Sequence, residues 1–167
     1  EPLAPNPPEG AYIDYTLKSD IKSLVTLDIL DASGALVRHY SSADQPPAND
    51  AKKSPIALEW AEHPVTLSNA AGMHRFVWPL RYRGVQTDKD TPATYIDGVW
   101  APPGSYRIVL TVDGQKLTQP LTVLADPRVE LPSAAYAQQF ALAKRIEEQR
   151  ARVASALHGS VDADAFR

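Results

Sequence analysis

The sequence contains no cysteine, and this absence excludes several kinds of chemistry at once. A chain without thiols forms no disulfide bond, has no thiolate nucleophile and builds no cysteine-ligated zinc site. Long apolar runs are also missing, since none approaches the roughly 18 residues that a membrane-spanning helix needs. We therefore expect no cysteine-based catalysis and no membrane span.

A surplus of basic residues is missing as well. The 167 residues include 17 Lys and Arg against 20 Asp and Glu, which gives a net charge of −3. Nucleic acids and anionic membranes are bound by clustered Lys and Arg side chains, so neither is an expected partner. Apolar residues, in contrast, make up 44% of the chain, which is enough to form the core of a globular domain.

Catalytic and metal-binding motifs are absent from the sequence. The four histidines, His39, His63, His74 and His158, do not have the spacing of a His-Glu-x-x-His zinc site. There is no Gly-x-Ser-x-Gly nucleophile turn and no glycine-rich loop of the kind that cradles phosphates. We therefore expect no metal, no cofactor and no catalytic residue. His74 is expected to be a hydrogen-bonded core or edge residue.

What the sequence does contain is a series of short alternating segments. Apolar and polar residues alternate over residues 11–18 and again over 25–29, which is the pattern of half-buried strands. Residues 31–34 (Asp-Ala-Ser-Gly) predict a turn to a third strand, and Asp-Gly at 113–114 predicts a second hairpin. About seven such segments, without strand–helix alternation, indicate a mainly β fold, an antiparallel β-sandwich.

The remaining strands are predicted from the same alternation. They are Ile56–Trp60, Val65–Leu67, Met73–Leu80, Tyr106–Val112 and Leu117–Leu124. Pro79 is expected to end its strand or to place it at an edge, and Pro120 to interrupt the last strand, because proline cannot donate to a β-ladder. Residues 83–101 show no regular pattern and are predicted to be an insertion at one end of the sandwich, where binding residues usually lie.

After Asp126-Pro127 the periodicity becomes helical. Ser133 is a suitable N-cap, and Gly159 is expected to end the helix. An apolar stripe follows the helical period, at Tyr136, Phe140, Ala143, Ile146, Val153 and Leu157. The stripe is expected to pack on the sandwich or to pair with a second copy of the chain. The charges assigned to the opposite, solvated face are Lys144, Glu147, Glu148 and Arg152.

These patterns divide the chain into four parts. We expect a linker over residues 1–10, the sandwich over 11–127, the amphipathic helix over 133–158 and a tail over 159–167. The proline-rich beginning is typical of a linker that enters a domain, which suggests a piece of a longer or processed protein.

Three segments in the same order resemble an immunoglobulin-like, fibronectin type III-like domain of flagellar hook-capping proteins. They are residues 25–38, which hold the Asp-Ala-Ser-Gly turn followed by Leu-Val-Arg, residues 71–78 (Ala-Gly-Met-His-Arg-Phe-Val-Trp) and residues 103–110 (Pro-Gly-Ser-Tyr-Arg-Ile-Val-Leu). The resemblance implies an immunoglobulin-like sandwich. Tyr106 resembles the tyrosine of such domains whose hydroxyl bonds to nearby backbone.

A narrower resemblance involves residues 6–11 (Asn-Pro-Pro-Glu-Gly-Ala), 75–82 (Arg-Phe-Val-Trp-Pro-Leu-Arg-Tyr) and 121–128 (Leu-Thr-Val-Leu-Ala-Asp-Pro-Arg). They are similar to a C-terminal region of bacterial proteins that carry a sortilin-like, glycosidase-related β-propeller. This resemblance implies a periplasmic or extracellular parent protein, whose other domains are the partners of this one. It implies no activity for the chain itself.

The candidate binding residues are aromatic and acidic. Trp60 and Trp78 follow the apolar alternation and are expected in the core. Trp100, with Tyr95 nearby, is the candidate surface platform on which a sugar ring would stack.

Three acidic residues of the predicted insertion, Asp88, Asp90 and Asp97, are the candidate polar ligands beside that platform, although aspartate is also an ordinary turn residue. The sequence thus favours a non-catalytic accessory domain. The first alternative is a carbohydrate-binding module that recognises a glycan, and the second is a small hydrolase that uses these aspartates.

Overall fold

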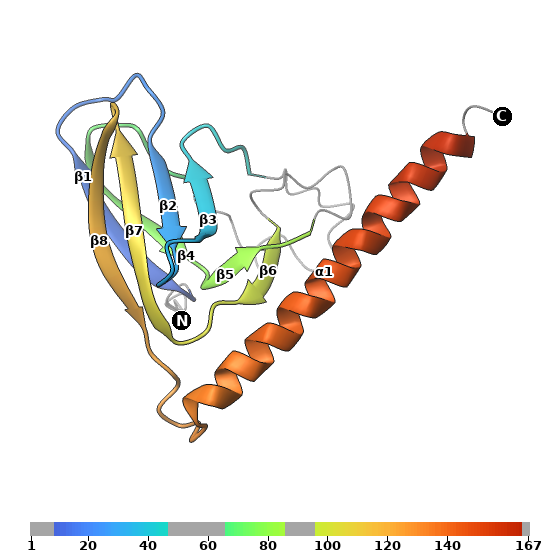
Figure 1. Ribbon diagram of the computed structural model, residues 1–167. Coiled ribbons are helices and arrows are strands. Elements are labelled where there is room, and N and C mark those ends of the chain that lie inside the picture. The colour runs from blue at the N-terminus through green and yellow to red at the C-terminus, as the bar shows by residue number, and fades with distance from the viewer. Residues whose placement is uncertain (1–8, 47–65, 86–95, 165–167) are drawn as a thin grey trace, which may run out of the picture.

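The computed structural model describes residues 9–46, 66–85 and 96–164, with side chains described as far as residue 156. Within these ranges the chain forms eight β-strands in antiparallel sheets and one C-terminal α-helix (Figure 1). The predicted mainly β class and the C-terminal helix are therefore confirmed.

Six of the described strands form two sheets. β1 (Ala11–Leu17) pairs antiparallel with β4 (Gly72–Trp78). The other sheet has the strand order β3-β2-β7-β8, and every neighbouring pair in it is antiparallel. Its strands are β2 (Thr26–Leu30), β3 (Leu36–Ser41), β7 (Gly104–Val112) and β8 (Gln115–Val123).

Buried aromatic side chains join the two sheets in one core. Trp78 of β4 is fully buried, and its ring centroid lies 5.4 Å from that of Tyr106 on β7. Phe76, two residues earlier on the same face of β4, lies 4.6 Å from the ring of Tyr40 on β3. Aromatic pairs at these separations stabilise a core beyond the area that they bury. The prediction that Trp78 is a core residue is confirmed.

Both predicted hairpins are present, and local chemistry explains them. In the turn between β2 and β3, Oδ1 of Asp31 accepts hydrogen bonds from the backbone N–H groups of Ser33 and Ala35, at 2.9 and 3.0 Å. Between β7 and β8, Asp113 and Gly114 have φ angles of 48° and 77°. Positive φ at both central residues is the requirement of a type I′ turn, whose twist matches that of the strands it connects.

The stretch predicted as an irregular insertion contains a strand. β5 (Arg81–Arg83) pairs antiparallel with β6 (Asp97–Trp100), so the prediction was wrong for this part of residues 83–101. β6 begins with Asp-Gly, which are turn formers. Glycine is required at position 98 by packing, since a Cβ there would lie 2.8 Å from the carbonyl oxygen of Arg83. Residues 86–95 lie outside the described residues.

The two prolines behave differently. β4 ends at Trp78, directly before Pro79 as predicted, and Leu80 turns away from the strand with a φ of 55°. β8, however, continues through Pro120, so the predicted interruption is wrong. The reason is that β8 is an edge strand with one neighbour, and an edge can place the nitrogen of a proline on its unpaired side.

Two predicted strands fall in or next to a gap in the described residues. Ile56–Trp60 lies outside them, as does the first residue of Val65–Leu67. Leu67 itself is described and belongs to no strand, which corrects the prediction, although it is buried in the core. An apolar residue at this position is therefore explained by burial in the core and not by β-strand pairing.

The helix α1 (Ser133–Asp164) begins at the predicted residue but continues past the predicted end. Gly159 does not terminate it; a glycine inside a helix costs about 1 kcal/mol relative to alanine, which a helix rich in strong formers tolerates. Figure 1 shows α1 passing β5 and β6 and then extending beyond the sheets. Within the described part of the chain, no helix is both long enough and apolar enough to cross a membrane.

Candidate functional site

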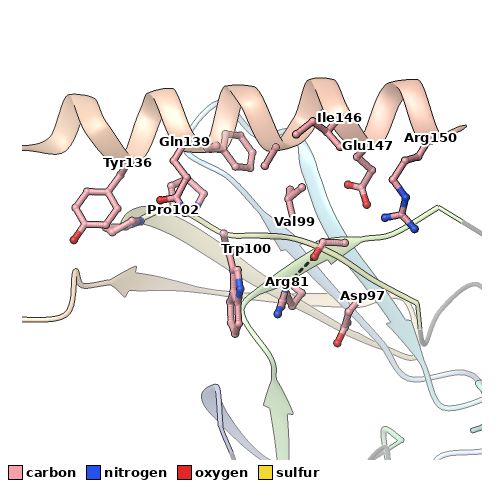
Figure 2. Close-up of a pocket in the computed structure, with 15 residues that line it drawn as sticks. Arg81, Asp97, Val99, Trp100, Pro102, Tyr136, Gln139, Ile146, Glu147 and Arg150 are labelled. Carbon is pink, nitrogen blue, oxygen red and sulfur yellow. Dashed lines mark hydrogen bonds between the residues drawn. The ribbon is translucent and has the colours of Figure 1, made fainter. Parts of the chain in front are cut away.

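A cavity of about 580 Å³ lies between α1 and the hairpin formed by β5 and β6 (Figure 2). Binding sites for small molecules commonly have volumes of about 300–1,000 Å³ and a mostly apolar lining with a few polar groups. Tyr136, Phe140 and Ile146 line it from the helix, and Val99 and Trp100 line it from β6. The helix therefore packs on the β part of the chain, and the cavity lies between the two.

Only the first residues of the predicted helical stripe are partly buried against the cavity. Tyr136, Phe140 and Ala143 are half-buried there, and the ring of Phe140 lies 5.1 Å from that of Tyr82 on β5. Ile146, which the stripe placed next in line, is 54% exposed. These residues recur at intervals of four and three, so one row of side chains along α1 points inward.

The next inward residue after Ala143 is Glu147, which sequence reasoning assigned to the solvated face. Its side chain is only 7% exposed, so that prediction was wrong. The carboxylate lies against the backbone of β6, because a Cβ on Gly98 would be 2.9 Å from Oε1 of Glu147. Among the described residues, Oε2 has no hydrogen-bond partner. A buried carboxylate without a partner is costly and therefore uncommon.

A second buried charge holds the β5–β6 hairpin in place. Arg38 of β3 is 3% exposed, and its Nη1 donates hydrogen bonds to the carbonyl oxygens of Tyr82 at 2.7 Å and Ile96 at 3.1 Å. The same nitrogen forms an ion pair with Oδ1 of Asp97, also at 3.1 Å. Asp97 was predicted as a ligand-binding or turn residue. It lies at the start of β6, lines the cavity and pairs with Arg38.

The predicted aromatic platform is only partly described. Trp100 is 54% exposed, as expected of a surface aromatic. The guanidinium of Arg81 lies over its ring, 3.5 Å from the centroid, so one face of the indole is already covered. Nη1 of Arg81 also donates to the carbonyl oxygen of Gly98 at 3.1 Å. Tyr95, and with it the predicted pairing of the two aromatics, lies outside the described residues.

The other acidic candidates, Asp88 and Asp90, also lie outside the described residues. Among the residues with described side chains, no group of three or more His, Cys, Asp or Glu is arranged to hold a metal ion. His74 makes the structural contacts predicted for it, with Nε2 2.7 Å from the carbonyl oxygen of Ala70 and its ring 5.2 Å from that of Tyr15.

Tyr106 fixes the chain where it enters β7 beside the cavity. Its hydroxyl donates a hydrogen bond of 2.7 Å to the carbonyl oxygen of Pro102, which is one of the cavity-lining residues. This is the hydroxyl-to-backbone bond that the sequence resemblance implies. Burial raises the pKa of the Tyr106 hydroxyl well above its usual range, so the side chain is a donor at neutral pH.

The chain was also compared with known proteins. No protein-family model, curated protein or solved structure matched it. The resemblance to the immunoglobulin-like module of hook-capping proteins and to propeller-associated regions therefore stays a prediction. The function is inferred from the residues of the cavity and of α1.

Proposed function

We propose that the chain is a non-catalytic accessory domain, an immunoglobulin-like β-sandwich with a docked helix, that binds other domains of a larger exported protein. The observation that supports this proposal is a second row of apolar side chains on α1, which is exposed. Leu142, Ile146 and Val153 lie at positions i, i+4 and i+11 of the helix and are 57%, 54% and 58% exposed. Single exposed apolar residues are ordinary, but a row on one helix face is the usual pattern of a helix that docks in an apolar groove.

Two exposed aspartates, Asp14 and Asp126, are held in ion pairs with arginines, which fits a structural role for them. The hydrogen bond from Arg75 lowers the pKa of Asp14, and the hydrogen bond from Arg128 lowers that of Asp126 to about 2. A carboxyl that serves as a general acid or base works best with a pKa near the operating pH. Carboxylates held ionised in this way are suited to structure and not to proton transfer.

The test uses this chain and the other domains of the proposed parent protein, produced separately and mixed in a calorimeter. We expect binding, and we expect Leu142→Asp to weaken it by about tenfold or more because it places a charge in an apolar contact. Ala141→Asp is the matched control, since it adds the same charge to the same helix at an exposed position outside the row. Equal binding by the two variants would contradict the proposal.

A second candidate function is the binding of a glycan at Trp100. The specific observation is that this indole is more than half exposed and lines a cavity of suitable size. Because Arg81 covers one face of the ring, a sugar would stack on the other face. Affinity electrophoresis against a panel of polysaccharides tests this function: it predicts retardation that Trp100→Ala abolishes, and no retardation on any glycan would retire it.

A further inference from the structure

Neither docking nor glycan stacking accounts for the buried carboxylate of Glu147. Figure 2 shows Glu147 pointing from α1 toward β6, into the space that the cavity occupies. We propose that this cavity is a binding site for a small organic cation, a primary amine with an apolar body, whose ammonium group pairs with Glu147. This inference goes beyond the accessory function and does not depend on it.

The carboxylate of Glu147 lacks a partner among the described residues. Glu147 is more than nine-tenths buried, and Oε2 accepts no hydrogen bond from any described residue. A charge taken out of water needs a compensating partner, and an ammonium group offers three donors to a carboxylate. An amine that enters the cavity would supply the partner that the described residues do not.

The other charged groups of the cavity are already used or lie in solvent. Asp97 is paired with Arg38. Arg81 stacks on Trp100 and donates to the backbone of β6. Arg150 is exposed on the next turn of α1 beside Glu147 (Figure 2). Among the described charged residues that line the cavity, Glu147 is thus the one that is both buried and uncompensated, and a cation would complement it.

The remaining lining indicates the body of the ligand. Phe140, Ile146 and Val99 give the cavity an apolar wall, and Tyr136 and Trp100 add two further aromatic rings. Aromatic faces also attract ammonium groups, most strongly where water is excluded. The volume of about 580 Å³ is sufficient for a ligand with a ring or a short alkyl chain attached to its amine.

The experiment is calorimetric titration of the intact chain with three ligands of the same shape and different charge. They are 2-phenylethylamine, the neutral 2-phenylethanol and the anionic 3-phenylpropanoate. We expect the amine to bind with a dissociation constant below about 1 mM and the other two to bind roughly tenfold more weakly or not at all. An amine that does not bind, or an anion that binds better, would overturn the proposal without any variant being needed.

Two variants locate the charge that is recognised. Glu147→Gln preserves the shape of the side chain and should weaken binding of the amine by roughly tenfold to a hundredfold. Glu148→Gln makes the same chemical change at the next, exposed position of the same helix, which does not line the cavity, and should leave amine binding unchanged. Equal loss in both variants, with circular dichroism that shows both to be folded, would contradict a specific role for Glu147.

Discussion

Arg38 and Glu147 are the two charged side chains that the fold buries most deeply within the described part of the chain. The guanidinium of Arg38 has backbone and carboxylate partners and connects β3 to the β5–β6 hairpin. Oε2 of Glu147 has no such partner among the described residues. Similar burial therefore has opposite consequences for these two residues. A buried charge with partners links the elements that it bonds to, whereas a buried charge without a partner lowers the stability of the fold.

Replacing the unpartnered charge should stabilise the ligand-free protein. We expect Glu147→Met, an apolar side chain of similar length, to raise the free energy of unfolding by about 1–3 kcal/mol, because it removes a buried carboxylate that no described residue compensates. Urea denaturation at neutral pH measures the change. A variant less stable than the parent would show that the carboxylate is compensated in solution.

The tyrosines predict how stability depends on pH. Burial raises the pKa of the hydroxyls of Tyr106, Tyr15 and Tyr82 above the ordinary value of 10.0. The unfolded chain then loses these protons at a lower pH than the folded chain does. This contribution to stability is complete below pH 10.0 and is lost as the pH rises above that value.

Urea denaturation midpoints at neutral pH and at about pH 11 test whether stability falls as the pH rises. We expect a lower midpoint at the alkaline pH, and a smaller decrease in Tyr106→Phe, because that variant has one fewer buried phenol. The same decrease in the variant and the parent would show that Tyr106 does not contribute to it.

At the scale of elements, the β5–β6 hairpin depends on one glycine. A Cβ at position 98 would come within 2.8 Å of the carbonyl oxygen of Arg83 and 2.9 Å of Glu147. We expect Gly98→Ala to separate β6 from β5 and to destabilise the protein by about 1–3 kcal/mol, as overpacking of a tight contact commonly does. The separation of the two strands is measured by hydrogen exchange at the amides of Gly84 and Ala101, which bond across this hairpin and should exchange faster in the variant. Unchanged exchange at these amides would contradict the expected separation.

The elements that could be predicted from the sequence are those whose cause is local. The turn at residues 113–114 needs two residues that tolerate positive φ, and Asp-Gly supplies them. The strand Asp97–Trp100 could not be predicted in this way because its first two residues favour turns. Its extended conformation depends on pairing with β5 and on the contact between Asp97 and Arg38, which are distant in the sequence.

At the scale of the whole molecule, the rotation of α1 about its axis decides which residues form the candidate site. Ile146 and Glu147 are neighbours, and hydrophobicity predicted that Ile146 would face inward. Glu147 is the buried one instead, because the bare backbone of Gly98 admits its side chain, whereas Ile146 lines the cavity but stays 54% exposed. The periodicity of a helix predicts that one face is buried, but the neighbouring element determines which one. Trp100 could be predicted as exposed, whereas the cavity beside it could not.

The same rotation leaves Leu142, Ile146 and Val153 more than half exposed, and the proposed accessory function rests on this row. The chain has no cysteine, so a single introduced thiol reports on its own position without background. Leu142→Cys should react rapidly with a maleimide in the isolated chain and slowly after the other domains of the proposed parent protein are added. Ala141→Cys should react rapidly in both states. If Leu142→Cys reacts equally fast with and without the other domains, this face of α1 is not the contact and the account of the domain as an interaction module is contradicted.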